Sequence, residues 1–236
     1  MTGWLGPDEW QAVALSLQVS IWATVLSLPL GVFVAYALAR WEFRGKQILN
    51  IAVHVPLILP PVVTGYLLLL SFGRRGAVGS FLEDTFGLVL AFRWTGAALA
   101  AAIMAFPLMV RAIRLAIEAV DPKLEEAAAT LGASRLRVFT TITLPLILPG
   151  LIAGAVLAFA KAIGEFGATI TFVSNIPGQT QTIPSAIYAF LQVPGGESGA
   201  LRLVVVSIII AIAALLVSEA LARRAQRRAS GRGDPP

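Results

Sequence analysis

Five long stretches of this 236-residue chain contain almost no charged residue, and they limit its possible folds more than any other feature. A helix needs about 20 mostly apolar residues to cross the hydrocarbon core of a bilayer. Only 13% of the residues are charged, roughly half the fraction that is usual in soluble domains. We therefore predict an all-α integral membrane protein with five transmembrane helices, at residues 10–39, 47–73, 94–117, 138–160 and 203–218.

Basic residues are distributed unevenly between the segments that connect these stretches. With the N-terminus outside the cytoplasm, thirteen Lys and Arg residues fall on the cytoplasmic side and only four on the outer side. Lys and Arg are enriched in the cytoplasmic loops of membrane proteins. We therefore predict a periplasmic N-terminus and a cytoplasmic C-terminus. Residues 223–236 then form a basic cytoplasmic tail, which suits a surface of anionic lipids.

Residues 161–202 begin as an apolar segment but soon become polar and rich in turn-forming residues. The segments SNIPGQTQTIP and VPGGESG contain several Gly and Pro residues, which interrupt regular structure. We predict a long exposed loop here, with one short helix near 183–192.

Composition also excludes several kinds of function. The chain has no Cys and a single His, and it shows no acid–base or metal-ligand constellation. Its basic residues lie at the ends of apolar stretches, which does not indicate nucleic-acid binding. The pattern G-x-x-x-x-G-K-[ST] of a phosphate-binding loop is missing, since Gly45-Lys46 is followed by Gln47. We expect no metal or cofactor site in this chain and no enzymatic activity of its own.

A charged cluster at 121–139 interrupts the apolar sequence on the predicted cytoplasmic side. Asp121 suits a helix N-cap and Pro122 suits the first helical position. Gly132 is suited to end this helix in the left-handed conformation. Ser134 can cap a second short helix through Phe139. These residues predict two short helices joined at a glycine, which form either a docking surface or a solvated connecting loop.

The spacing within this cluster resembles the EAA signature of ABC importer permeases. Glu126-Ala127-Ala128 is followed after three residues by Gly132, and after nine more by Ile-x-Leu-Pro. In that family the segment forms coupling helices that insert into a groove of a separate ATPase subunit, where ATP–Mg is bound. The resemblance implies a coupling role for Glu125, Glu126, Ala127, Ala128, Gly132, Arg135, Arg137, Ile142, Leu144 and Pro145.

Other segments resemble bacterial molybdate permeases, among them HVPLILPPVVTGYLLL and GEFGATITFVSNIPGQTQTIPSAIY. The GEFGA element is shared with sulfate and tungstate permeases, so importers of those oxyanions stay open as alternatives. The resemblance covers about residues 10–222 and implies a type I ABC permease domain in the bacterial inner membrane. It also implies a homodimer that works with two ATP-binding cassette subunits and a periplasmic molybdate-binding protein. Some relatives carry an additional N-terminal span, and we expect neither that span nor an appended regulatory domain here.

A few polar residues lie within or beside the apolar stretches. Lys161 and Glu165 either border a translocation path or form an ion pair that stabilises the bundle. Pro56, Pro60 and Pro61 predict a kink in the second span. We interpret Arg111 and Arg114 as reaching lipid headgroups. The candidate path residues are Pro61, Thr64, Lys161, Gly164, Glu165 and Gly167.

A transporter or channel that needs no ATPase is the alternative from a different class. Secondary transporters of this kind are commonly built from inverted repeats. No such repeat is visible in the sequence, and the coupling signature would then have no purpose.

Overall fold

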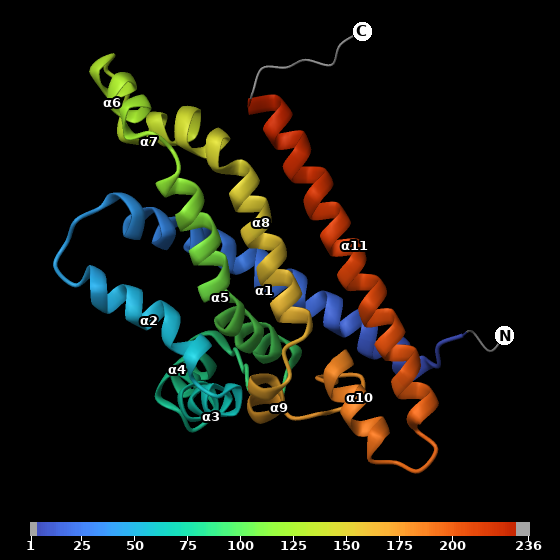
Figure 1. Cartoon of the computed structure of the whole chain (residues 1–236). Helices are drawn as coiled ribbons and strands as arrows, with labels where there is room; N and C mark the ends of the chain where they lie inside the picture. Colours follow the sequence, from blue (N-terminus) through green and yellow to red (C-terminus); the bar gives the residue numbers. More distant parts are fainter. Residues whose placement is uncertain (1–3, 230–236) are drawn as a thin grey trace, which may run out of the picture.

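The computed structural model describes residues 4–229, with side chains to residue 224, and within this part the regular structure is entirely helical (Figure 1). The elements in chain order are α1 (Pro7–Arg40), α2 (Lys46–Ile58), α3 (Pro61–Phe72), α4 (Ala77–Phe86), α5 (Trp94–Glu118), α6 (Pro122–Thr130), α7 (Arg135–Val138), the π-helix η1 (Phe139–Thr143), α8 (Leu144–Ile163), α9 (Gly167–Val173), α10 (Ile183–Leu191) and α11 (Glu197–Ala229).

Four helical segments of the described chain are long and apolar enough to cross a membrane: Pro7–Arg40, Trp94–Glu118, Arg135–Ile163 and Glu197–Arg224. They contain four of the five predicted spans. The third of these segments runs without interruption through α7, η1 and α8. A fifth crossing exists if α2 and α3 together count as one bent span.

The second predicted span differs from the expectation of one kinked helix. It is broken at Leu59–Pro60, and α2 and α3 are bent by 114° relative to each other. Leu59 is extended, with φ −67° and ψ 143°, as expected because the ring of a following proline disfavours helical backbone. Pro56 lies inside α2 and does not end it. The prolines therefore produce a change of direction much larger than a kink.

Helix α5 is at the centre of the core and packs along α1 on one side and α8 on another. Small residues make this close packing possible, since Ala97, Ala100 and Ala101 are fully buried in α5. Gly154 of α8 is part of the same contact. A Cβ there would lie 3.2 Å from the carbonyl oxygen of Met109.

A second, smaller cluster connects α1, α10 and α11 and is built from Ala12, Val13, Ile183, Ala186 and Leu203. The Ser16 hydroxyl accepts a hydrogen bond from the Ile183 amide at 2.7 Å. Nearby, Arg202 donates to both carboxylate oxygens of the buried Glu9, at 2.6 and 3.2 Å. The first turns of α1 and of α11 are therefore held together.

The predicted exposed loop at 161–202 is corrected by the structure. The expected short helix is present as α10, but α9 adds a second helix in which Ala168, Phe172 and Val173 are fully buried. Thr180 is also fully buried, and its hydroxyl accepts from the Ile176 amide and donates to the Ser174 carbonyl. The segment contributes to the core because its apolar residues are packed against α3 and α5.

The helices are arranged so that the molecule has two distinct ends (Figure 1). Helices α6 and α7 lie at one end together with the C-terminal part of α11, whereas α3, α4, α9 and α10 gather at the other. Helix α1 connects the two ends. Arg40 in its last turn reaches Glu125 of α6, and Glu9 in its first turn reaches Arg202.

Candidate functional site

The first short helix of the charged cluster forms as its sequence predicts. The Asp121 carboxylate accepts a hydrogen bond from the Lys123 amide at 3.0 Å, and Pro122 occupies the first turn. Gly132 has φ +84°, in the left-handed region that favours glycine. Its amide donates to the Ala129 carbonyl, which closes the end of α6.

The second short helix begins as predicted but does not end at Phe139. The Ser134 hydroxyl accepts from the Arg137 amide at 3.4 Å and caps α7. The chain then continues through η1 into α8, so the predicted pair of short helices is one short helix and the start of a long one. Proline has no N–H, so Pro145 cannot donate a backbone hydrogen bond to the preceding turn. The wider turn of the π-helix η1 ends two residues before Pro145.

An exposed apolar face lies along α6 and its C-cap, and we call Leu124, Ala127 and Leu131 the docking face. Leu131 is 89% exposed and Leu124 is 48% exposed, which is unusual for leucine beside so many charges. Leu124, Ala127 and Leu131 follow the i, i+3, i+7 spacing of one helical face. An exposed apolar patch with polar surroundings is typical of a surface that binds another protein.

The two adjacent acids have different surroundings, which sequence reasoning did not predict. Glu126 is exposed, whereas the side chain of Glu125 is only 15% exposed. The Glu125 carboxylate contacts Arg40 Nε at 3.1 Å and accepts from the Thr143 hydroxyl at 2.7 Å. Arg40 also donates to the Val120 carbonyl at 2.8 Å. Glu125 therefore attaches α6 to the end of α1 and to η1.

Glu125→Ala is expected to release α6 from the rest of the molecule. The change leaves Arg40 without its carboxylate, and breaking a largely buried ion pair costs about 3 kcal/mol. We expect trypsin to cleave after Lys123 several-fold faster in membrane vesicles containing this variant. Glu126→Ala is the matched control and should leave the cleavage rate unchanged. Equal rates for the two variants would contradict the anchoring role of Glu125.

The residues predicted to line a translocation path come together where α3 meets α9. A Cβ on Gly167 would lie 2.7 Å from the Cβ of Pro61, so these two helices are in close contact. Thr64 is buried on the same side of α3, and its hydroxyl has no hydrogen-bond partner within the part of the chain that the structure describes. Gly164 caps the end of α8, and the chain is not helical again until α9 begins at Gly167.

Glu165 is buried between α8 and α9 and is fully engaged by neighbouring groups. Its carboxylate lies 2.7 Å from Lys161 Nζ and accepts from the Ala168 amide at 3.0 Å. The second contact caps the start of α9. This geometry favours the ion-pair interpretation, and a part for these residues in a translocation path stays a prediction.

Lys161→Met is expected to destabilise the protein by about 3 kcal/mol, because the buried carboxylate of Glu165 loses its counter-charge. The thermal unfolding midpoint of the purified protein measures this loss. Adding Glu165→Gln to Lys161→Met should recover much of the stability, and Lys161→Arg should behave like the original protein. A midpoint unchanged by Lys161→Met would show that the pair contributes little.

A sequence profile of the family described as "Binding-protein-dependent transport system inner membrane component" matches residues 27–230. The chain belongs to this family. Its members work with ATPase subunits and a substrate-binding protein.

The chain is similar in sequence to three transport system permease proteins. The "Molybdenum transport system permease protein ModB" of Escherichia coli (strain K12) is 65% identical over 225 residues, which cover 95% of this chain and 98% of the relative. The protein of the same name from Haemophilus influenzae is 56% identical over 93% of this chain and 96% of its own. The "Sulfate transport system permease protein CysT" of Salmonella typhimurium is 35% identical over 79% of this chain and 67% of its own.

Two solved structures have a fold similar to that of this chain, although their sequence identity to it is low. A bacterial ABC transporter that imports the polysaccharide alginate is similar with a TM-score of 0.73 and 18% identity, covering 93% of this chain and 80% of that one. An inward-facing MetNI methionine ABC transporter is similar with a TM-score of 0.69 and 15% identity, covering 92% and 94%. The helical arrangement is therefore that of an ABC importer membrane component.

Proposed function

We propose that this chain is the membrane-spanning subunit of an ATP-driven molybdate importer in the bacterial cytoplasmic membrane. The observation that carries the proposal is the 65% identity to a molybdenum permease over 95% of the chain, against 35% to a sulfate permease over 79%. Two such subunits form a homodimer in this proposal. They work with two ATP-binding cassette subunits and a periplasmic molybdate-binding protein.

The proposed topology has a periplasmic N-terminus and a cytoplasmic C-terminus. Its main support is the excess of Lys and Arg in the segments assigned to the cytoplasm. The separation of the two ends of the fold agrees with this assignment, because α6 and the C-terminal part of α11 share one end (Figure 1). The docking face and the basic tail are then on the same, cytoplasmic side. Residues 230–236 of that tail lie outside the described residues.

The mechanism proposed for this subunit is mechanical and requires no chemistry in the chain itself. The docking face inserts into a groove on the ATPase subunit, which binds ATP–Mg and hydrolyses it. Movement of α6 is passed on by the Glu125–Arg40 pair to α1 and by the Glu125–Thr143 hydrogen bond to η1 and α8. Helix α8 ends at Gly164, beside the contact between α3 and α9. Alternating access follows if this contact shifts as the ATPase subunits close.

Reconstitution tests the proposed function and its alternatives. The complete complex in proteoliposomes should import radiolabelled molybdate only with ATP and a molybdate-loaded binding protein. An excess of sulfate should compete poorly. Competition by sulfate or tungstate at equal concentration would instead identify an importer of broader or different oxyanion preference. Uptake by the membrane subunit alone under an ion gradient would favour an ATP-independent transporter and contradict the proposal.

A further inference from the structure

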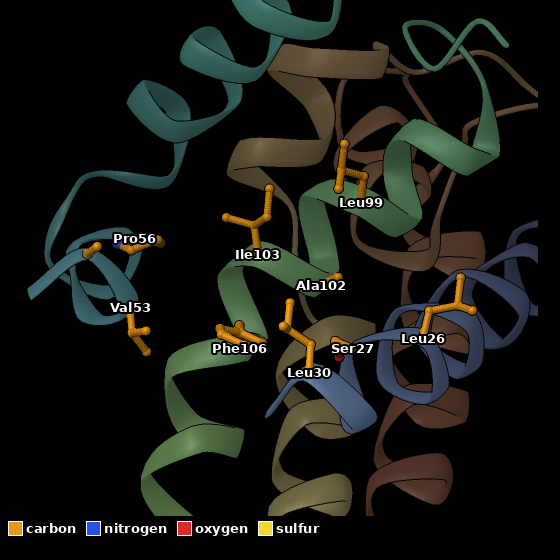
Figure 2. Close-up of a pocket in the computed structure, with 10 residues that line it drawn as sticks. Leu26, Ser27, Leu30, Val53, Pro56, Leu99, Ala102, Ile103 and Phe106 are labelled. Carbon is orange, nitrogen blue, oxygen red and sulfur yellow. The ribbon is translucent and has the colours of Figure 1, made fainter. Parts of the chain in front are cut away.

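A polar pocket lies between α2 and α5, and it shares no residue with the docking face, with the Glu165 pair or with the apolar pocket lined by Leu30, Val53 and Phe106 (Figure 2). It has a volume of about 280 Å³ and is lined by Asn50, His54, Arg111, Arg114, Leu115 and Glu118. Arg111 is two helical turns before the end of α5, so the pocket lies within a candidate span. The Arg111 side chain is exposed on the surface of the described chain, and an arginine within a span is usually matched by a partner of opposite charge.

The charges of the pocket are only partly balanced by its own residues. Arg114 donates to Glu118 at 2.7 Å and to the Asn50 side-chain oxygen at 3.3 Å. Arg111 makes neither a hydrogen bond nor an ion pair with any residue that the structure describes. The pocket therefore carries one positive charge more than its own carboxylate neutralises.

One further group of the pocket can donate to an anion. The Asn50 side-chain oxygen is used by Arg114, so its NH₂ group remains available as a donor. His54 Nδ1 lies 2.8 Å from the main-chain carbonyl of Asn50, so Nδ1 donates there and Nε2 of the neutral ring is an acceptor that does not bind an anion. Arg111 supplies a planar set of donors that matches two oxygens of a tetrahedral anion.

We propose that this α2–α5 pocket binds a tetrahedral oxyanion through the Arg111 guanidinium and the Asn50 amide. The pocket is large enough for a small anion with several waters, each of which occupies about 30 Å³. Binding by two donor groups with the anion still partly hydrated is weak, so the anion can leave again. This inference rests on the proposed function, in which the free oxyanion is molybdate. The phosphate of a lipid headgroup offers the same chemistry.

Two binding measurements on the complete complex distinguish these sources. In nanodiscs of phosphatidylcholine, without binding protein, equilibrium binding of radiolabelled molybdate tests the free oxyanion. In nanodiscs that contain phosphatidylglycerol, native mass spectrometry counts the retained anionic lipid. Arg111→Gln should reduce one of these two signals at least tenfold. Arg75→Gln is the matched control, because it removes an equal charge from an exposed residue between α3 and α4, outside the pocket and outside the basic tail.

Each result has a defined meaning. Saturable molybdate binding that is lost in Arg111→Gln supports a site for the free oxyanion, and loss of retained phosphatidylglycerol supports a headgroup site. If neither signal differs between Arg111→Gln and Arg75→Gln, the pocket is not an oxyanion site. Asn50→Leu removes the second donor without changing charge, and it replaces Arg111→Gln if that variant does not assemble. Parallel uptake by the unmodified complex keeps the proposals separate, since failure to import molybdate refutes the proposed function alone.

Discussion

Leu131→Asp is expected to reduce ATP-driven uptake at least tenfold while leaving the protein in the membrane. Leu131 is 89% exposed and lies at the end of α6, so the change costs the isolated subunit little. In the complex proposed above, the ATPase subunit covers the docking face, and burying an unpaired carboxylate there costs several kcal/mol. A loss of 1.4 kcal/mol already corresponds to about a tenfold weaker association.

Copurification of the ATPase subunit and uptake in proteoliposomes measure this effect. Leu131→Met is the matched control, because it preserves an apolar side chain of similar size and should retain both signals. Normal uptake by Leu131→Asp would show that the docking face does not contact the ATPase. Loss of the variant from the membrane would instead show that Leu131 stabilises the subunit itself.

Gly65→Val is expected to have the largest effect on stability, lowering it by about 3 kcal/mol or more. A Cβ at Gly65 would lie 2.5 Å from the Ala168 carbonyl oxygen and 2.9 Å from its Cα. Both are backbone atoms of α9 and cannot move aside as a flexible side chain can. Helices α3 and α9 must therefore separate, which exposes the buried residues of α9.

The thermal unfolding midpoint and the amount of protein in the membrane measure this loss. Gly164→Ala is the control, since a Cβ there meets only the Ala160 carbonyl, at 3.7 Å, and the backbone φ of −91° suits alanine. We expect Gly164→Ala to remain within about 1 kcal/mol of the original protein. If Gly65→Val unfolds at the same temperature as the original protein, α3 and α9 are not packed closely at Gly65.

Local signals in the sequence were sufficient for the short elements of the docking segment. The cap at Asp121, the left-handed turn at Gly132 and the cap at Ser134 depend on residues within a few positions of each other, and all three are confirmed. The long apolar helices were predictable for a similar reason, because each needs only its own composition to be recognised.

Features that depend on distant residues could not be predicted in the same way. Glu125 and Glu126 are neighbours in sequence, but only Glu125 meets Arg40, which lies 85 residues earlier. The proline before α3 is compatible either with a kink or with a full change of direction. The structure has a bend of 114° between α2 and α3, and α3 packs against α9, which lies about 100 residues later in the chain. Helix α9 was missed because seven residues are too few for an apolar span.

In the proposed complex, the continuous helix from α7 through η1 to α8 acts as a lever whose first residues adjoin α6. It contains 29 residues, Arg135–Ile163, and is therefore about 43 Å long. A tilt of about 5° at the α7 end would displace the far end by roughly 4 Å, which follows from that length alone. Such a displacement exceeds the length of a hydrogen bond. Lys161, Glu165 and α9 have to follow this helix or lose their contacts, so in the proposed complex a small rotation at the ATPase subunit is amplified at the end of the helix that meets α9.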